Sequence, residues 1–433
     1  MRYLAPTAIV VALAMVLAAC QQGEDGSPGA SGGAQGGTVN LLVVFGGEEL
    51  ANFEAMLAPF EEETGITVEI ESNRDANAIL QTRIDGGNPP DVAGLPGPGP
   101  MAEFARAGHL KPMPEEVANI LNEQYDEGWV VAGTVDDQLV GVFVKTSLKG
   151  LIWYNPEQFE AAGYEVPEDW DGLVSLADQI AADGTPPWGI GLESGAASGW
   201  PATDWIEDFV LRQSGPDVYD AWVDGEQAWT SPEIREAFEA FGMWATDPEY
   251  VAGGPNTVLS TAFGNGGDCM FTDPPECYLH HQASFMSGFF EENFPEVAVA
   301  GETYDYFMMP PIEFDAITTA GDLFGMFNDT DAAQQLMAYL VSAEAQQAWV
   351  ETGGVLSANQ DVSLDAYPDD ATRQAAEIMT SAETTRFDGS DRMPASMNDA
   401  FFGAILEYVQ NPDNLDSILE ELDAAQAEAY AEG

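Results

Sequence analysis

The sequence predicts an α/β protein built from two lobes, and three observations support this fold class. The chain has 433 residues, which is enough for two domains with separate cores. Strand and helix patterns alternate from residue 41 onward, as is typical of parallel α/β sheets. Residues 140–155 then join two strand patterns, and we interpret them as the crossover from one lobe to the other. A hydrophobic fraction of 45% agrees with a globular chain.

The N-terminal region has the pattern of a lipoprotein signal. Arg2 gives a short positive start, and residues 8–18 form an apolar run too short to span a bilayer comfortably. The run ends in Leu-Ala-Ala-Cys, which resembles the lipobox of bacterial lipoproteins, in which the cysteine carries a lipid. An ordinary secretory signal with an incidental cysteine is the alternative. We predict a lipoprotein signal peptide at residues 1–20, lipidation of Cys20, and a flexible Gly-, Ser- and Gln-rich linker at residues 21–38.

The first lobe is predicted from a strand–helix–strand pattern. Residues 41–45 are an apolar run typical of a buried strand, and residues 66–70 alternate as a second strand. The helix between them has apolar residues at helical spacing: Phe53, Met56, Leu57 and Phe60. Two strands joined by one helix lie parallel, so a parallel sheet is expected. Further helices are predicted at 76–84 and 101–107, separated by a loop at 96–100.

The crossover carries two of the three lysines in the chain. Alternating valines at 140–144 predict a half-buried strand, and the apolar run 151–154 predicts a strand buried in a central sheet. Lys145 and Lys149 lie between the two strands. They are either solvated loop cations, the commoner situation for lysine, or side chains that face a ligand cleft between the lobes.

Beyond the crossover, further strand and helix patterns follow. Strands are predicted at 188–192, 306–309 and 324–327. Helices are predicted at 170–182, 200–213, 231–241, 330–340, 343–351, 371–381, 397–409 and 416–431. We expect lobe 1 at 39–148, lobe 2 at 149–320, a return to lobe 1 at 321–356, and C-terminal helices of lobe 2 at 357–433.

Two cysteines, Cys269 and Cys277, lie within the predicted second lobe. In an exported protein a local disulfide between them is the preferred interpretation. A metal site with His280 and His281 is the alternative, although adjacent histidines cannot easily share one tetrahedral ion. We predict no metal and no cofactor.

The net charge of the chain limits the classes of ligand and partner that it is expected to bind. There are 74 acidic and 12 basic residues, a formal net charge of −62. Such a surface repels nucleic acid and anionic lipids and disfavours phosphorylated or carboxylated ligands. Self-repulsion is relieved by salt, so a halophilic source is a hypothesis that a salt-independent melting temperature would contradict.

The motifs favour binding over catalysis. The sequence has no Gly-rich phosphate loop, no G-x-S-x-G and no H-E-x-x-H motif, and only three histidines. Paired carboxylates could serve a glycosidase, but with 74 acids such pairs arise by chance. Sugar binding needs aromatic faces edged by polar side chains. Five segments in loops at the ends of strands or helices place aromatic and polar side chains near one another. They are residues 46–49, 199–205, 281–285, 321–324 and 387–394.

With these features the chain resembles an extracellular solute-binding protein of the carbohydrate group, which delivers sugars to ABC transporters. The resemblance covers nearly the whole chain. It rests on Cys20 and on residues 88–92, 151–156, 320–322, 353–357 and 393–394. Within the group, Lys145, Lys149 and residues 199–201, 269–277 and 388–394 look most like α-glucoside binders.

The resemblance implies a periplasmic-binding-protein fold with a multi-strand hinge and a ligand cleft that closes on its solute. It implies a monomeric lipoprotein on the extracytoplasmic face of the membrane, which captures a neutral α-glucoside di- or oligosaccharide and passes it to a permease without catalysis. The expected ligand-binding residues are Glu48, Glu49, Asp91, Lys145, Lys149, Trp200, Thr203, Asp204, Phe285, Asp322, Asp388, Asp391 and Phe402.

One departure from the group concerns the loop after Val92. It has Leu95 and prolines where maltose binders carry an aromatic and a charged residue, so the ligand need not be maltose. The alternatives are the same fold binding a polyamine, a secreted glycoside hydrolase or lyase, and a surface adhesin or scaffold.

Overall fold

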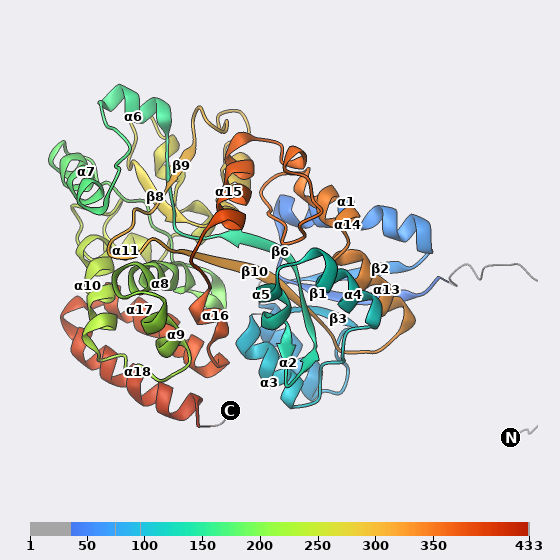
Figure 1. Ribbon diagram of the computed structural model, residues 1–433. Coiled ribbons are helices and arrows are strands. Elements are labelled where there is room, and N and C mark those ends of the chain that lie inside the picture. Colours follow the sequence, from blue (N-terminus) through green and yellow to red (C-terminus); the bar gives the residue numbers. More distant parts are fainter. Residues whose placement is uncertain (1–35, 74, 96, 432–433) are drawn as a thin grey trace, which may run out of the picture. The chain divides into compact units, whose positions relative to one another are not determined.

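The computed structural model describes residues 36–431 apart from residues 74 and 96 (Figure 1). Every described helix and strand lies between Thr38 and Ala429. The predicted signal peptide, Cys20 and nearly all of the predicted linker lie outside the described residues. Within residues 36–431, no helix combines the length and the apolar character needed to cross a bilayer.

The larger sheet begins with the predicted strand–helix–strand unit. Strands β1 (Thr38–Val43) and β2 (Thr67–Ser72) are joined by helix α1 (Gly47–Thr64) and pair in parallel, which confirms the prediction. Strand β1 also pairs in parallel with β3 (Val92–Leu95). Helix α1 ends at Gly65, whose φ of 68° is a left-handed conformation that glycine adopts without a steric penalty.

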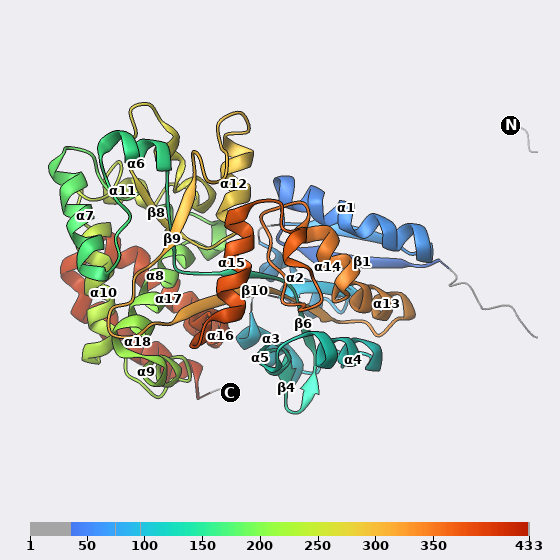
Figure 2. The ribbon, with the colours of Figure 1, turned by 45° about the horizontal axis from the view of Figure 1, so that its top comes forward.

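Two long strands, β6 (Gly141–Leu148) and β10 (Ile317–Met326), complete this sheet with the short β11 (Thr385–Phe387). Strands β6 and β10 pair antiparallel and run side by side in Figures 1 and 2. The second half of β10 also pairs with β3, and its first half pairs with β11. The chain leaves β6 through Lys149 and Gly150 to enter the second sheet, so β6 and β10 lead from one sheet toward the other.

Strand β6 is buried on both faces, so the prediction of a half-buried strand is wrong. Val142 and Val144 pack into a hydrophobic core with Phe53, whereas Phe143 packs into another core with Leu323. Both faces of the sheet are covered by other elements, and a strand in such a sheet has no solvent-facing side.

The sequence predicts only some of the helices around this sheet. Helices α2 (Ala76–Asp85), α13 (Asp331–Leu340) and α14 (Ala343–Val350) form close to their predicted ranges. Helix α3 (Pro98–Arg106) starts inside the predicted loop, because proline at a first helical position loses no hydrogen bond. The sequence did not predict the helices α4 (Glu115–Gln124) and α5 (Glu127–Ala132), or the small hairpin of β4 (Thr134–Val135) and β5 (Gln138–Leu139).

The smaller sheet has three antiparallel strands. Strand β7 (Leu151–Tyr154) lies in its centre, between β8 (Leu279–Gln282) and β9 (Asp305–Met308). The central place of β7 confirms what its fully apolar run predicts. The Trp153 indole N–H donates to the Gln282 carbonyl at 3.0 Å, which satisfies a polar atom inside the core.

The strand predicted at 188–192 does not form. Trp188 makes only single bridges, with Val251 and Leu279. Gly189 lies so close to the disulfide that an added Cβ would be 2.4 Å from the Cys269 Sγ. Its backbone N–H groups donate to separate segments, Trp188 to the Tyr250 carbonyl and Leu192 to the Val258 carbonyl, both at 3.0 Å, so no continuous ladder forms.

Most of the helices around the smaller sheet share a large aromatic core, in which the Trp188 ring lies 4.9 Å from Trp205 and 4.8 Å from Trp244 between ring centroids. Helices α12 and α15 pack instead into the core that holds Phe53, through residues such as Phe290 and Ala371. The helices are α6 (Pro156–Ala162), α7 (Trp170–Ala182), α8 (Trp200–Ser214), α9 (Pro216–Val223), α10 (Pro232–Ala245), α11 (Pro255–Val258), α12 (Met286–Asn293), α15 (Asp370–Ser381), α16 (Gly389–Arg392), α17 (Ala395–Gln410) and α18 (Leu415–Ala429).

Cys269 and Cys277 are joined by a disulfide. The bond closes a short loop, and such a crosslink stabilises a protein by about 2–3 kcal/mol because it restricts the unfolded chain. We predict that the double variant Cys269→Ser/Cys277→Ser loses about that much free energy of unfolding in urea titrations. A reductant should destabilise the wild type and leave the double variant unchanged. Equal stability of the two proteins would contradict the prediction.

Candidate ligand-binding site

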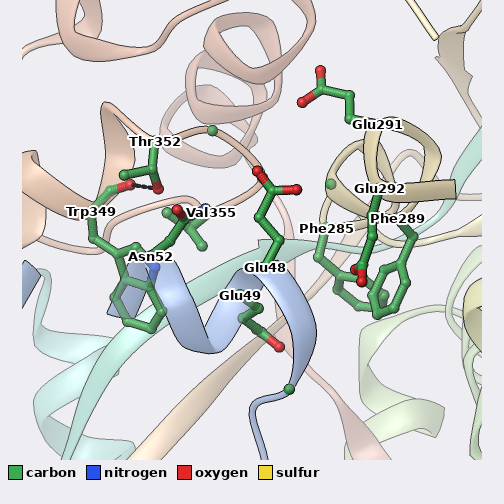
Figure 3. Close-up of a pocket in the computed structure, with 14 residues that line it drawn as sticks. Glu48, Glu49, Asn52, Phe285, Phe289, Glu291, Glu292, Trp349, Thr352 and Val355 are labelled. Carbon is green, nitrogen blue, oxygen red and sulfur yellow. Dashed lines mark hydrogen bonds between the residues drawn. The ribbon is translucent and has the colours of Figure 1, made fainter. Parts of the chain in front are cut away.

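A concave pocket lies at the N-terminal end of α1. Three segments far apart in the sequence meet there: the first turn of α1, helix α12, and the end of α14 with the loop after it (Figure 3). Its lining residues are Gly46, Glu48, Glu49, Asn52, Phe285, Gly288, Phe289, Glu291, Glu292, Trp349, Thr352, Gly353, Gly354 and Val355.

One side of the pocket is aromatic. Phe285 and Phe289 face the space, and Trp200 and Phe263 stand behind them. The Phe263 ring lies 5.2 Å from both Trp200 and Phe289, and Phe285 lies 6.1 Å from Trp200, between ring centroids. We call these four residues the aromatic wall. Trp349 lies on the other side of the first turn of α1, so the pocket has aromatic rings on two sides (Figure 3).

Four of the other lining residues carry carboxylates. Glu48 and Glu49 belong to the first turn of α1, and Glu291 and Glu292 belong to α12. Figure 3 shows Glu48 and Glu49 pointing to opposite sides of their helix. Burial, together with the charges of nearby carboxylates, raises the pKa of Glu291, whose carboxylate accepts a hydrogen bond from the Tyr304 hydroxyl at 2.7 Å.

Lys145 does not line the pocket but is paired with Glu49, which does. Its ammonium group donates to the Glu49 carboxylate and lies 3.0 Å from the Asp322 Oδ2. It also lies 5.2 Å from the centre of the Phe45 ring and 6.0 Å from that of Trp349. Burial alone would lower the pKa of Lys145, but the two carboxylates raise it further, so the lysine stays charged.

Lys149 is the centre of a second buried ion cluster. Its Nζ lies 2.7 Å and 2.8 Å from the two Asp204 oxygens and 2.9 Å from the Asp388 Oδ2. The Trp200 ring of the aromatic wall lies 5.2 Å away. Burial opposes the charge of Lys149, but Asp204, Asp388 and Asp391 together raise its pKa well above the usual value. Both crossover lysines are therefore buried, and the interpretation of solvated cations is wrong.

The carboxyl groups around Lys149 have shifted pKa values that differ from one another. Burial and the charge of Asp388 raise the pKa of Asp204 to about 7, although Lys149 opposes the shift. Burial and Asp388 also raise the pKa of Asp391 and of Glu207 well above the usual values. The Glu207 carboxylate accepts the backbone N–H groups of Gly389 at 2.6 Å and Ser390 at 3.0 Å. For Asp388 the pKa is lowered, because Lys149 outweighs the effect of burial.

This cluster predicts a pH dependence of stability. The folded protein keeps the Asp204 proton up to about pH 7, whereas the unfolded chain releases it near 3.8. The folded state therefore binds more protons in this interval, so Asp204 makes the free energy of unfolding fall from about pH 4 to 7 and level off above. Asp204→Asn should reduce this slope by about 1 kcal/mol per pH unit in urea titrations. The control is Asp413→Asn at an exposed position, and equal slopes in all three proteins would contradict the prediction.

A separate contact joins α3 to the segment around α16. An added Cβ on Gly97 would lie 2.5 Å from the Asp391 carbonyl oxygen, and one on Gly99 would lie 1.9 Å from that of Met393. The backbone N–H of Ala395 also donates to the Glu103 Oε1 at 2.9 Å. Met101 of α3 packs in the core with Leu323 of the larger sheet, whereas Met393 packs in the core of the helices around the smaller sheet. The contact therefore links the two halves and needs glycine at both positions.

Gly99→Ala tests whether this contact supports ligand binding. The added methyl group would force α3 away from Met393, and we expect ligand affinity to fall about tenfold, equivalent to about 1.4 kcal/mol. The control is Gly403→Ala, since an added Cβ there meets no atom within 4 Å. Calorimetric titration of both variants measures the effect. Unchanged affinity in Gly99→Ala would show that binding does not need the contact.

The structure brings together most of the predicted site residues. Glu48, Glu49 and Phe285 line the pocket. The members of the two ion clusters and their immediate surroundings lie behind it: Lys145, Asp322, Lys149, Trp200, Thr203, Asp204, Asp388 and Asp391. Asp322 lies inside β10, beside an irregularity of the ladder, and not in the loop predicted at 321–324.

Two predicted residues lie elsewhere. Asp91 precedes β3, and its carboxylate accepts hydrogen bonds from the Asn40 backbone N–H at 2.9 Å and from the Asn328 side chain at 3.1 Å. These bonds fasten strand ends together away from the pocket. Phe402 is half-buried on α17, where its backbone packs against Gly199, and it does not line the pocket.

The sequence alone predicted only three of the fourteen residues that line the pocket, Glu48, Glu49 and Phe285. Asn52 and Trp349 belong to predicted helices but were not expected at the site, and Phe289, Glu291 and Glu292 belong to α12, which was not predicted. A signal for Phe289 existed, because it lies one helical turn after Phe285 and therefore on the same face of a helix.

Comparison with known proteins agrees with this architecture. Residues 46–347 match the family model of the bacterial extracellular solute-binding proteins. The Osmoprotective compounds-binding protein GgtB of Synechocystis sp. is 38% identical over 95% of this chain and 97% of its own length. The Alpha-glucosides-binding periplasmic protein AglE of Rhizobium meliloti is 38% identical over 88% of this chain and 85% of its own.

Solved structures show the same fold. A structure titled Chitin oligosaccharide binding protein has a TM-score of 0.79 and 20% identity, covering 91% of this chain and 99% of that one. Maltose-bound MalE3 of T. maritima has a TM-score of 0.71 and 18% identity, covering 90% and 99%. The fold is therefore the two-lobed periplasmic-binding-protein fold, as the sequence predicts, in a family of binding proteins and not of enzymes. The chain belongs to the bacterial extracellular solute-binding proteins.

Proposed function

We propose that the protein is the substrate-binding component of an ABC importer and captures a neutral sugar, an α-glucoside of two or more units, in the pocket at the start of α1. The observation that carries the proposal is the pairing of aromatic rings with carboxylates around one space. Aromatic faces pack against the C–H faces of a sugar ring, and carboxylates accept hydrogen bonds from its hydroxyls. The 38% identity to a protein named for α-glucosides supports the same ligand class.

The charges around the pocket support an uncharged ligand over an anion. The two nearby lysines, Lys145 and Lys149, are each already paired with two carboxylates. The described residues that line the pocket include no lysine or arginine. A phosphorylated or carboxylated sugar would meet Glu48, Glu291 and Glu292 with no free cation to offset them.

The family places the protein outside the cytoplasm, and we propose that a lipid on Cys20 holds it there as a monomer. The hinged lobes would close over the bound sugar, and the closed form would dock on the permease. We propose that the protein releases the sugar unchanged. Hydrolysis of any bound glucoside by the purified protein would contradict this part of the proposal.

A titration panel tests the ligand class. Maltose, trehalose, sucrose, palatinose, spermidine and glycine betaine are titrated into the purified protein by calorimetry. Glycine betaine is included because one relative is named for osmoprotective compounds. The proposal expects heat of binding from at least one α-glucoside and none from spermidine or glycine betaine. Binding of spermidine without binding of any sugar would overturn it.

A cationic solute is the second candidate, since the same carboxylates and rings would also surround an amine. Among the described residues, Glu48 and Glu292 have no ion-pair partner. Salt distinguishes the two ligand classes. The affinity for a polyamine should fall steeply between 50 mM and 500 mM salt, while the affinity for a neutral sugar should stay nearly constant.

A further inference from the structure

Helix α8 carries three charged residues on a face that other elements cover. Asp204, Asp208 and Arg212 follow one another at intervals of four residues, so they form one row along the helix. Their exposed fractions are 3%, 0% and 1%. A buried charge is costly unless a partner holds it. Asp204 belongs to the ion cluster of Lys149, whereas Asp208 and Arg212 make separate contacts.

Asp208 is contacted by groups from three elements. The Thr318 hydroxyl of β10 donates to the Asp208 Oδ1 at 2.9 Å, and the His281 Nε2 of β8 lies 2.7 Å from the Oδ2. The Arg212 Nε of α8 itself lies 3.8 Å from the Oδ1. Burial opposes the charge of Asp208, but the contacts with His281, Arg212 and Thr318 outweigh it and lower the pKa of this carboxyl group. The carboxylate is therefore charged and joins β8, β10 and α8.

The first crossover between the sheets packs directly on this carboxylate. Gly150 has a φ of 73°, and an added Cβ there would lie 2.9 Å from the Asp208 Oδ2 and 3.1 Å from the Arg212 Nη2. The Lys149 N–H donates to the Thr318 carbonyl at 3.0 Å, so the crossover is also bound to the start of β10. No side chain fits between Gly150 and Asp208, which explains the glycine at this position.

The second crossover runs from the end of β9 to the start of β10 and is fastened to the same helix. The Met309 N–H donates to the Gly150 carbonyl at 2.7 Å. The Arg212 carbonyl accepts the N–H groups of Glu313 and Phe314 at 2.9 Å and 3.0 Å. Both crossovers therefore meet on this side of α8.

We infer that Asp208 is a positioning residue for ligand binding, because it holds both crossovers in one arrangement relative to α8. Two lobes move relative to each other by changes in the segments that join them. Loose crossovers would let the lobes adopt orientations that do not close on the ligand, and the apparent affinity falls with the fraction of molecules able to close. The effect on affinity rests on the proposed function, whereas the anchoring of the crossovers does not.

Two substitutions at Thr318 test the anchoring without a ligand. Thr318→Val removes the hydroxyl that donates to Asp208 and keeps the shape of the side chain, whereas Thr318→Ser keeps the hydroxyl. Hydrogen–deuterium exchange is followed in peptides that cover residues 147–152 and 309–320. We expect exchange of both peptides to become about tenfold faster in Thr318→Val and to change by less than about twofold in Thr318→Ser. Residues 147–152 decide the test, because they do not contain the substitution.

The same proteins are then titrated with maltose, trehalose, sucrose and palatinose by calorimetry. For each sugar that binds the wild type, we expect Thr318→Val to weaken binding about tenfold and Thr318→Ser to weaken it by less than about twofold. Gly150→Ala places a methyl group against Asp208 and should weaken binding as Thr318→Val does. Asp208, Gly150 and Thr318 are not among the described residues that line the pocket, so a lost contact with the sugar would not explain a weaker affinity.

Thr146→Val is the control for the loss of a buried hydroxyl. Thr146 is buried in β6, and its hydroxyl has no hydrogen-bond partner among the described residues. This variant should keep the exchange rates and the affinities of the wild type.

Unchanged exchange of residues 147–152 in Thr318→Val would overturn the inference. Faster exchange with unchanged sugar affinity would show that the contacts of Asp208 only stabilise the fold, and would also overturn it. If none of the four sugars binds the wild type, the proposed function fails, and the exchange rates alone decide whether Asp208 anchors the crossovers.

Discussion

Replacing Lys149 by methionine is expected to lower the free energy of unfolding by about 3–5 kcal/mol, the usual cost of removing one partner from a buried ion pair. Methionine has a similar shape but no charge. Asp204 and Asp388 would then face each other without a cation in a site that excludes water, since the Lys149 side chain is 6% exposed and those of Asp204 and Asp388 are 2% and 4% exposed. Urea titration at pH 7 followed by far-ultraviolet circular dichroism measures the loss.

Lys111→Met is the matched control for this variant. Lys111 is only partly buried and has no ion pair among the described side chains, so its replacement should change the free energy of unfolding by less than about 0.5 kcal/mol. If Lys149→Met proved as stable as Lys111→Met, the lysine would have to be solvated. The ion cluster behind the aromatic wall would then not exist as described.

Phe285→Ala is expected to weaken sugar binding by about 10- to 100-fold, or about 1.4–2.8 kcal/mol. Phe285 is half-buried and supplies a ring face to the pocket, and its own position is fixed by Trp200, Phe263 and Phe289. Alanine removes the aromatic surface on which a sugar ring would lie, while the carboxylates of the pocket remain in place. Calorimetry with the best-binding α-glucoside measures the loss.

Phe271→Ala controls for the removal of a half-buried ring as such. Phe271 stacks on Phe294 at 4.6 Å between ring centroids and does not line the pocket. This variant should lose stability but keep its sugar affinity. A Phe285→Ala protein that binds sugar like the wild type would show that the aromatic wall is only packing.

The sequence predicts the fold well because local patterns decide it. The spacing of Phe53, Met56 and Phe60 specifies α1, and the parallel pairing of its flanking strands follows from their connection. The apolar run of β7 identifies a strand at the centre of a sheet. Local patterns fail where tertiary contacts decide instead, as at 188–192, where the backbone forms hydrogen bonds with several separate segments and not with one strand.

The site is harder to predict because its members come from distant parts of the chain. Lys149 contacts Asp204 and Asp388, which are 55 and 239 positions further along the sequence. In a chain with 74 acids, sequence alone cannot tell which carboxylates a lysine will meet. Glu291 and Trp349 likewise reach the pocket only through the packing of α12 and α14 against the start of α1.

The central claim is that the pocket at the start of α1 holds a neutral α-glucoside, and a crystal structure with the tightest-binding glucoside tests it most directly. We expect a sugar ring against Phe285 or Phe289, with hydroxyls within hydrogen-bond distance of Glu48 or Glu291. A sugar bound elsewhere on the protein, with this pocket unchanged, would contradict the claim.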